Sequence, residues 1–297
     1  METSVKNLKV HGLWGSIDLR AASMRASRVA LVFLCASCVR AGTIGFGFES
    51  PVYNGSASGT SLTNQDGWYL GGGPGTPGGV VYTYAGTGIP VAPGGGAQFA
   101  ALIGPSAREQ HDIDFSSAST WSVTFDVLTH YAGSSTSPIG TFTMVHTANG
   151  TYQFRATDRW DLTGGTWSMF FDVYHSNGDQ WGTQDTQVGA FHGLSTDHWY
   201  QEQVVFDAAS NRILLVSMYD PGTAAGASFS PTGWYLGGGA SASFSGDAIL
   251  MYGGPSSGSG NAIGFDNILL QSVPEPATWM LLLSGAAALC CLRRRKL

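Results

Sequence analysis

The stretch Glu109–Phe115 reads E-Q-H-D-I-D-F and gathers three carboxylates within six residues. On a β-strand, Asp112 and Asp114 would lie on the same face, because side chains alternate along a strand. A retaining glycoside hydrolase uses two carboxylates about 5 Å apart as nucleophile and acid. Only two other glutamates, Glu49 and Glu202, lie between residues 42 and 272, and neither pairs with this stretch by spacing. We therefore expect no catalytic residue here.

Residues 42–272 contain neither the H-E-x-x-H zinc motif nor a thiol nucleophile. The six histidines form no H-E-x-x-H, and the segment contains no cysteine that could act as a nucleophile. Calcium prefers hard oxygen ligands, which an aspartate-rich, glycine-turned surface supplies. Asp112 and Asp114 are the first candidates for such a site, with Asp179 and Asp266 behind them, although turn aspartates facing water are the simpler interpretation. No other cofactor is expected.

One tryptophan has the sequence context of a sugar contact. Trp181 follows a turn in N-G-D-Q-W-G, beside Asp179. An indole ring can stack on the apolar face of a sugar while neighbouring polar groups bind its hydroxyls. Trp121 and Trp199, by contrast, alternate with apolar residues and are expected in the core.

The last 25 residues have the order of a sorting or anchoring tail. Val273, Pro274, Glu275 and Pro276 form V-P-E-P, and the two prolines keep this segment out of a helix. Residues 277–292 carry no charge and would make a short transmembrane helix of about 24 Å. A cluster follows that should stay on the cytoplasmic side, made of Arg293, Arg294, Arg295 and Lys296.

These three features in this order resemble the PEP-CTERM sorting signal of Gram-negative bacteria. The resemblance implies processing by an exosortase, a membrane cysteine transpeptidase. It also implies an inner-membrane-anchored precursor that is delivered to the cell surface or the extracellular matrix. The alternative is an ordinary C-terminal membrane anchor.

The N-terminus has the pattern of a secretory signal peptide. Arg25 and Arg28 precede an apolar stretch at 29–39, and V-R-A allows cleavage after Ala41. We expect translation to start at Met24 and assign 1–41 to this extension and signal. An uncleaved anchor is the alternative, although 11 apolar residues are short for a membrane span.

The exported segment, residues 42–272, is strongly acidic. It contains 17 acidic residues, no lysine and four arginines, which gives a net charge near −13. Such a surface repels phosphate backbones, which argues against nucleic-acid binding. All four cysteines lie outside the segment, so its stability must come from a packed core.

Short alternating strands run through residues 42–272, and no stretch of 12 residues shows a helical period. The strands we expect span 120–131, 139–157 as a hairpin around Asn149-Gly150, 167–175, 199–206, 213–219, 248–252 and 262–270. This pattern predicts an all-β, antiparallel sandwich. The sequence G-W-Y-L-G-G-G occurs at both 67–73 and 233–239, which predicts two equivalent corners.

The segments F-E-S-P-V-Y at 48–53 and F-D-N-I at 265–268 resemble secreted laminin-G-like and concanavalin-A-like jelly rolls. In such folds the first strand commonly pairs with the last. The resemblance implies a role in the cell envelope or biofilm matrix, with exopolysaccharide as a candidate ligand. Because the segment shows no catalytic pair of carboxylates, we expect an exported, non-enzymatic protein. Two alternatives stay open, namely a secreted β-glucan-type glycoside hydrolase and a structural surface protein without a ligand.

Overall fold

The computed structural model describes residues 42–71, 78–130, 138–146, 151–161, 166–178, 191–254 and 261–273. All of these residues belong to one compact unit, residues 41–275. The predicted signal peptide and the predicted transmembrane helix lie outside the described ranges. Within these ranges, no helix has the length and apolar character needed to cross a membrane.

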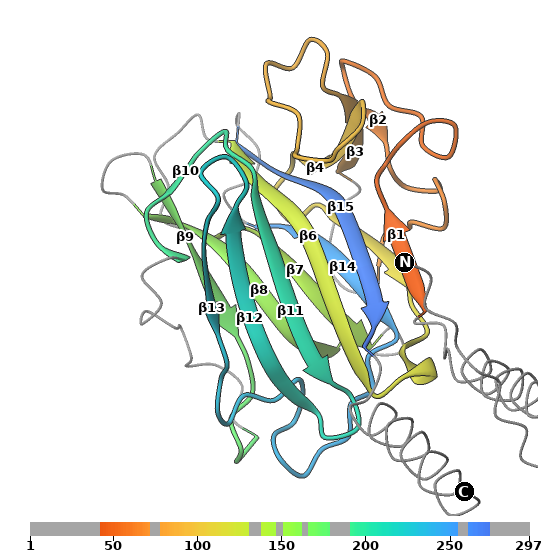
Figure 1. Ribbon diagram of the computed structural model, residues 1–297. Coiled ribbons are helices and arrows are strands. Elements are labelled where there is room, and N and C mark those ends of the chain that lie inside the picture. Colours follow the sequence, from red (N-terminus) through yellow and green to blue (C-terminus); the bar gives the residue numbers. More distant parts are fainter. Residues whose placement is uncertain are drawn as a thin grey trace, which may run out of the picture. The chain divides into compact units, whose positions relative to one another are not determined.

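One layer of the fold is an antiparallel sheet of nine strands (Figure 1). Eight strands follow the order β13-β12-β11-β6-β15-β4-β3-β2, and β1 pairs with the second half of β15. The strands are β1 (Thr43–Phe46), β2 (Thr60–Ser61), β3 (Gly79–Thr83), β4 (Gln98–Leu102), β6 (Thr120–His130), β11 (Tyr200–Asp207), β12 (Arg212–Asp220), β13 (Ala225–Phe229) and β15 (Ala262–Ser272).

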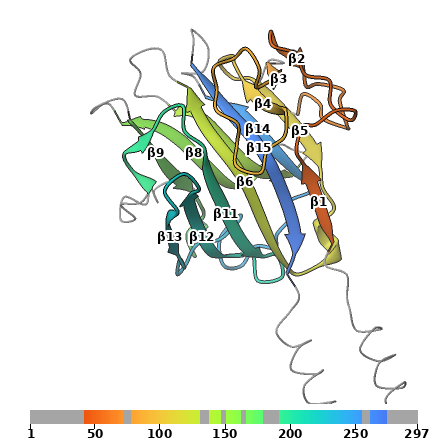
Figure 2. The same cartoon turned by 45° about the horizontal axis from the view of Figure 1, so that its top comes forward.

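The second layer is a sheet of six strands in the order β10-β9-β8-β7-β14-β5. Its strands are β5 (Arg108–Asp112), β7 (Pro138–His146), β8 (Thr151–Asp161), β9 (Thr166–Asp172), β10 (Leu194–Ser195) and β14 (Ala248–Gly253). A 3₁₀ turn, η1 (Phe115–Ser117), precedes β6. The two sheets lie face to face as a sandwich (Figures 1 and 2).

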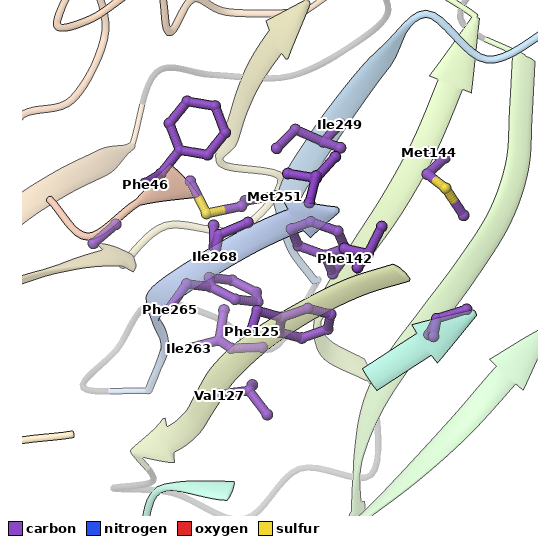
Figure 3. Close-up of a cluster of buried hydrophobic side chains, with 14 of the residues drawn as sticks. Phe46, Phe125, Val127, Phe142, Met144, Ile249, Met251, Ile263, Phe265 and Ile268 are labelled. Carbon is purple, nitrogen blue, oxygen red and sulfur yellow. The ribbon is translucent and has the colours of Figure 1, made fainter. Parts of the chain in front are cut away.

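Aromatic and branched side chains from both sheets fill the space between the layers (Figure 3). Phe125 of the nine-stranded sheet stacks on Phe142 of the six-stranded sheet, with ring centroids 4.3 Å apart. Phe265 contacts both rings at about 6 Å. Because the described core contains no disulfide partner, this apolar burial is the principal source of stability.

The predicted antiparallel sandwich is confirmed, and each segment assigned from the alternation contains an observed strand. The first described strand also pairs with the last, in the register Thr43↔Gln271 to Phe46↔Ile268, as expected. The more specific jelly-roll resemblance stays a prediction. The alternation did not reveal β2, β3, β4, β5, β10 and β13. β4 is buried at all five positions, and β5 reads R-E-Q-H-D, so neither has a period-2 apolar pattern.

The repeated G-W-Y-L-G sequence forms the same corner twice. Gly67 and Gly233 have φ angles of 80° and 79°, a region that favours glycine. The tryptophan that follows each glycine is buried, and the next residue makes an isolated antiparallel bridge. Tyr69 bridges to Gln110 of β5. Tyr235 bridges to both Tyr174, after β9, and Arg212 of β12, so the second corner links the two sheets.

Candidate functional site

The outer face of the nine-stranded sheet carries polar side chains in cross-strand rows. Along β6 and β11 the core takes every second residue, so the residues between them point outward. We call this surface the polar face and define it by Ser122, Thr124, Asp126, Gln201, Gln203, Ser217, Tyr219 and Asn267.

The strand registers place these residues directly opposite one another. One row runs from Tyr219 through Gln201 and Asp126 to Asp266, across β12, β11, β6 and β15. The next row runs from Ser217 through Gln203 to Thr124. Opposite side chains in an antiparallel pair lie about 5 Å apart, so each row is a continuous polar strip.

Hydrogen bonds between strands hold the polar face in place. Asn267 Nδ2 donates to Asp126 Oδ2 at 2.7 Å, and Gln201 Nε2 donates to Asp126 Oδ1 at 3.3 Å. In the next strip, Gln203 Nε2 donates to Ser122 Oγ at 2.8 Å. These contacts fix the planes of three carboxamide groups, which is the preorganisation that a binding surface needs.

A β-bulge in the last strand places Asn267 on this face. The register between β15 and β6 shifts between Asp266 and Leu269, and Asn267 has a φ of 50°. Asparagine tolerates this left-handed region better than most residues. The extra residue turns the carboxamide toward Asp126, which is a common use of bulges next to functional sites.

The segment 84–97 covers one side of the sheet and bounds the polar face. Trp199 Nε1 donates to the carbonyl of Pro90 at 2.6 Å, and Tyr84 stacks on Phe99 with centroids 4.7 Å apart. This segment closes a second apolar cluster, which contains Leu128. Trp199 is therefore buried as expected, but on the outer side of the sheet.

Two neighbouring carboxylates lie beneath this cover. Asp126 and Asp266 are 1% and 0% exposed, and Tyr84 donates its hydroxyl to Asp266 Oδ2 at 2.8 Å. Burial, with the nearby charges of Asp126 and Glu49, raises the pKa of Asp266 to about 7. Burial also raises the pKa of Asp126, against the opposing hydrogen bonds from Asn267 and Gln201. Neither carboxylate can contact a large substrate directly.

A third carboxylate of this kind lies elsewhere, in β5. Glu109 is fully buried, accepts a hydrogen bond from Thr63 Oγ1 at 2.7 Å, and leaves Oε2 without a partner. Burial raises the pKa of Glu109 to about 7. Glu109 faces the core beside Met251, so the structure gives it no surface on which to act.

Comparison with protein-family models gives one match, to the PEP-CTERM protein-sorting motif at residues 272–296. The chain carries a PEP-CTERM sorting motif. This motif marks an exported protein that is sorted by an exosortase. A comparison with curated protein sequences gives no match.

The solved structures that resemble this chain are distant from it in sequence. One is a carbohydrate esterase from the Shiga toxin-encoding bacteriophage phi24B, at 12% identity and a TM-score of 0.44, covering 79% of this chain and 100% of that one. Another is the cellulose induced protein Cip1, at 15% identity and a TM-score of 0.44, covering 77% and 97%. A third is the CBM2 module of the evolved Dit of Lactobacillus casei phage J-1, at 10% identity and a TM-score of 0.44, covering 80% and 100%. Such distant likenesses say nothing about the activity of this chain.

Most residues of the PEP-CTERM motif lie outside the described ranges, as do Trp181 and Asp179. These excluded motif residues include Pro274, Glu275, Pro276 and the cluster Arg293, Arg294, Arg295 and Lys296. Val273 is described, and its backbone N–H donates to the carbonyl of Thr120 at 2.8 Å. The motif therefore begins as a continuation of the last strand.

The two aspartates proposed for calcium have local structural partners. Asp112 accepts a hydrogen bond from the Tyr69 hydroxyl, and Asp114 caps η1 by accepting from the Ser116 N–H at 2.9 Å. Across the described part of the chain, no three His, Cys, Asp or Glu side chains gather in a way that could hold a metal ion. Calcium binding by Asp112 and Asp114 stays a prediction, which a calcium titration of the melting temperature would test.

The polar face is the feature that the sequence analysis missed. The sequence does contain the polar residues of this face. They are the alternate residues of two correctly assigned strands, namely S, T and D in W-S-V-T-F-D-V at 121–127 and the two Q in Q-E-Q at 201–203. A strand prediction from alternation uses the apolar residues of each strand and leaves the polar residues between them unexplained. Only the register across β6, β11 and β12 brings the polar half together.

Proposed function

We propose that the exported domain binds a neutral polysaccharide of the cell envelope or extracellular matrix through the polar face, without enzymatic activity. The observation that carries this proposal is the pair of hydrogen-bonded strips, the first of which ends at the exposed Tyr219. In this proposal the precursor is first held in the inner membrane by residues 277–292, in a Gram-negative cell.

The polar face offers the groups that sugars require. Each carboxamide has two N–H donors and an acceptor oxygen, so Gln201 keeps a donor and its carbonyl after bonding Asp126. Tyr219 lies opposite Gln201 and is 42% exposed. An aromatic ring next to fixed carboxamides can bind both the apolar face of a sugar and its hydroxyls.

Charge indicates which polysaccharides fit. None of the residues that define the polar face is basic, and the exported segment has a net charge near −13. An anionic polymer would approach a surface of the same sign, which raises the free energy of binding. A neutral glycan meets no such barrier, so we assign a neutral polysaccharide as the ligand class.

The burial of the carboxylates supports a non-enzymatic role. The alternative, a β-glucan-type glycoside hydrolase, needs two carboxylates that line the substrate about 5 Å apart. Asp126 and Asp266 lie beneath the surface, whereas Asp112 and Asp114 serve Tyr69 and η1. Release of reducing sugar from a panel of β-glucans would contradict this part of the proposal.

Tyr219→Ala should weaken retention on exopolysaccharide extracted from the producing cells by about five- to tenfold. This factor corresponds to roughly 1 kcal/mol or more for a lost aromatic stacking contact. The melting temperature should stay unchanged, because the ring is exposed. Val52→Ala, which removes an exposed apolar group outside the polar face, is the matched control. Equal retention of Tyr219→Ala and wild type, or a glycan array without hits, would favour the ligand-free alternative.

A further inference from the structure

The end of the sandwich from which the PEP-CTERM motif leaves carries an open pocket of about 420 Å³. The loop around η1, the β11–β12 turn and the segment before β14 line this pocket. Phe115 and Phe244 form its aromatic part, with ring centroids 5.6 Å apart in an edge-to-face arrangement. The arrowheads of β11 and β15 point to this same end (Figures 1 and 2).

The sorting motif starts inside the sheet, with no spacer. The backbone N–H of Ser272 donates to the carbonyl of Gly42 at 2.9 Å, and the N–H of Val273 donates to the carbonyl of Thr120 at 2.8 Å. Pro274 has no N–H, so the hydrogen-bonded ladder has no donor at the next residue. The matched motif begins at residue 272, so its first two residues belong to the folded domain.

The pocket lies next to this exit point in the chain. Ser119 lines the pocket and immediately precedes Thr120, which holds Val273. The carbonyl of Ser119 also accepts from the N–H of Ala208, another lining residue, at 2.6 Å. Two residues of extended chain span at most about 7 Å, so Glu275 cannot lie farther than that from Val273. An enzyme that binds Pro274 and Glu275 must therefore lie against this end of the sandwich.

The chemistry of the pocket matches one kind of partner surface. All eight residues that line it are uncharged, in a segment whose net charge is near −13. We propose that this pocket docks an apolar side chain on the exported face of the exosortase, so that the enzyme recognises the folded end together with the motif. The inference rests on the sorting assignment and is independent of polysaccharide binding.

Two changes test this docking site in the full-length protein, expressed in cells that contain the exosortase. Ala209→Glu places a carboxylate in the pocket, and Ala85→Glu adds the same charge at an exposed loop alanine outside it. A second variant carries an insertion of eight Gly and Ser residues between Val273 and Pro274, which separates the motif from the pocket. The measurement is the rate of precursor conversion in a pulse–chase experiment.

We expect Ala209→Glu to slow conversion about fivefold, because a charge in an apolar contact must be desolvated, whereas Ala85→Glu converts at the wild-type rate. The spacer should also slow conversion, and Ala209→Glu should then have no further effect. Wild-type conversion of Ala209→Glu, or faster conversion with the spacer, would overturn the proposal. The sorting assignment has its own control, because replacement of Pro274, Glu275 and Pro276 together should stop conversion whether or not the pocket contributes.

Discussion

The isolated domain should be more stable at pH 5 than at pH 8. Asp266 and Glu109 each have a pKa raised to about 7 by burial, from ordinary values near 4. A carboxyl group with a raised pKa in the folded state binds its proton more tightly there than in the unfolded chain. Ionising the buried carboxyl group therefore lowers the free energy of unfolding. This loss is absent below about pH 4, grows as the pH rises, and reaches its full size above about pH 7.

The magnitude follows from the size of these two shifts. Each group should lower the free energy of unfolding by roughly 2 to 3 kcal/mol between pH 5 and pH 8. Asp114 and Asp220 act in the opposite direction, because hydrogen bonds lower their pKa values. Their contribution is lost only as the pH falls through the acidic range below about pH 4, so it does not change between pH 5 and pH 8.

Asp266→Asn is the decisive variant for this pH effect. It keeps the shape of the side chain and removes the charge beside Asp126 and Glu49, so it should raise the melting temperature at pH 8 and change it little at pH 5. Asp112→Asn, at an exposed position, removes one charge without relieving burial and serves as control. Both proteins are compared in a chelator, so that bound cations do not contribute. A lower melting temperature for Asp266→Asn at pH 8 would show that its carboxylate stabilises the fold.

Replacing Pro274 and Pro276 with Ala and Glu275 with Gln should abolish processing of the precursor. These three residues lie within the matched motif, and they follow directly on Val273, whose N–H is hydrogen-bonded to Thr120. The uncleaved protein should accumulate in the inner-membrane fraction, because residues 277–292 and the terminal basic cluster are unchanged.

Fractionation and immunoblotting measure the effect of this triple replacement. Gln271→Ala, an exposed position in the last strand, controls for a change near the motif that leaves it intact. The circular dichroism of the domain should be the same in all three proteins. Normal delivery of the triple variant to the cell surface would show that the tail acts only as an anchor.

Strand assignment from sequence succeeds where one face of a strand is polar and the other is buried. β6 alternates in this way, and its apolar residues Trp121, Val123 and Phe125 lie in the core as expected. It fails where both faces are covered or where polar residues are buried. β4 lies between the core and the segment 84–97, and β5 buries Arg108, Glu109 and Gln110. In such strands the period-2 pattern disappears.

The candidate site was harder to predict than the fold, because it depends on contacts between distant residues. Gln201 and Asp126 are 75 residues apart, and Asn267 reaches Asp126 across 141 residues through a bulge. No spacing along the chain encodes these neighbours. The PEP-CTERM motif was predictable because its residues are contiguous, so its pattern does not depend on the fold.

Hydrogen–deuterium exchange of residues 42–273, with and without the extracted exopolysaccharide, tests the central claim most directly. Each mass-resolved peptide reports whether the ligand slows opening of the backbone that it covers. We expect protection to concentrate in β6, β11 and β12, where the polar face lies, and to require about five- to tenfold more polysaccharide in Tyr219→Ala. Saturating polysaccharide that leaves these three strands unprotected, or protects only other parts of the sandwich, would contradict the assignment.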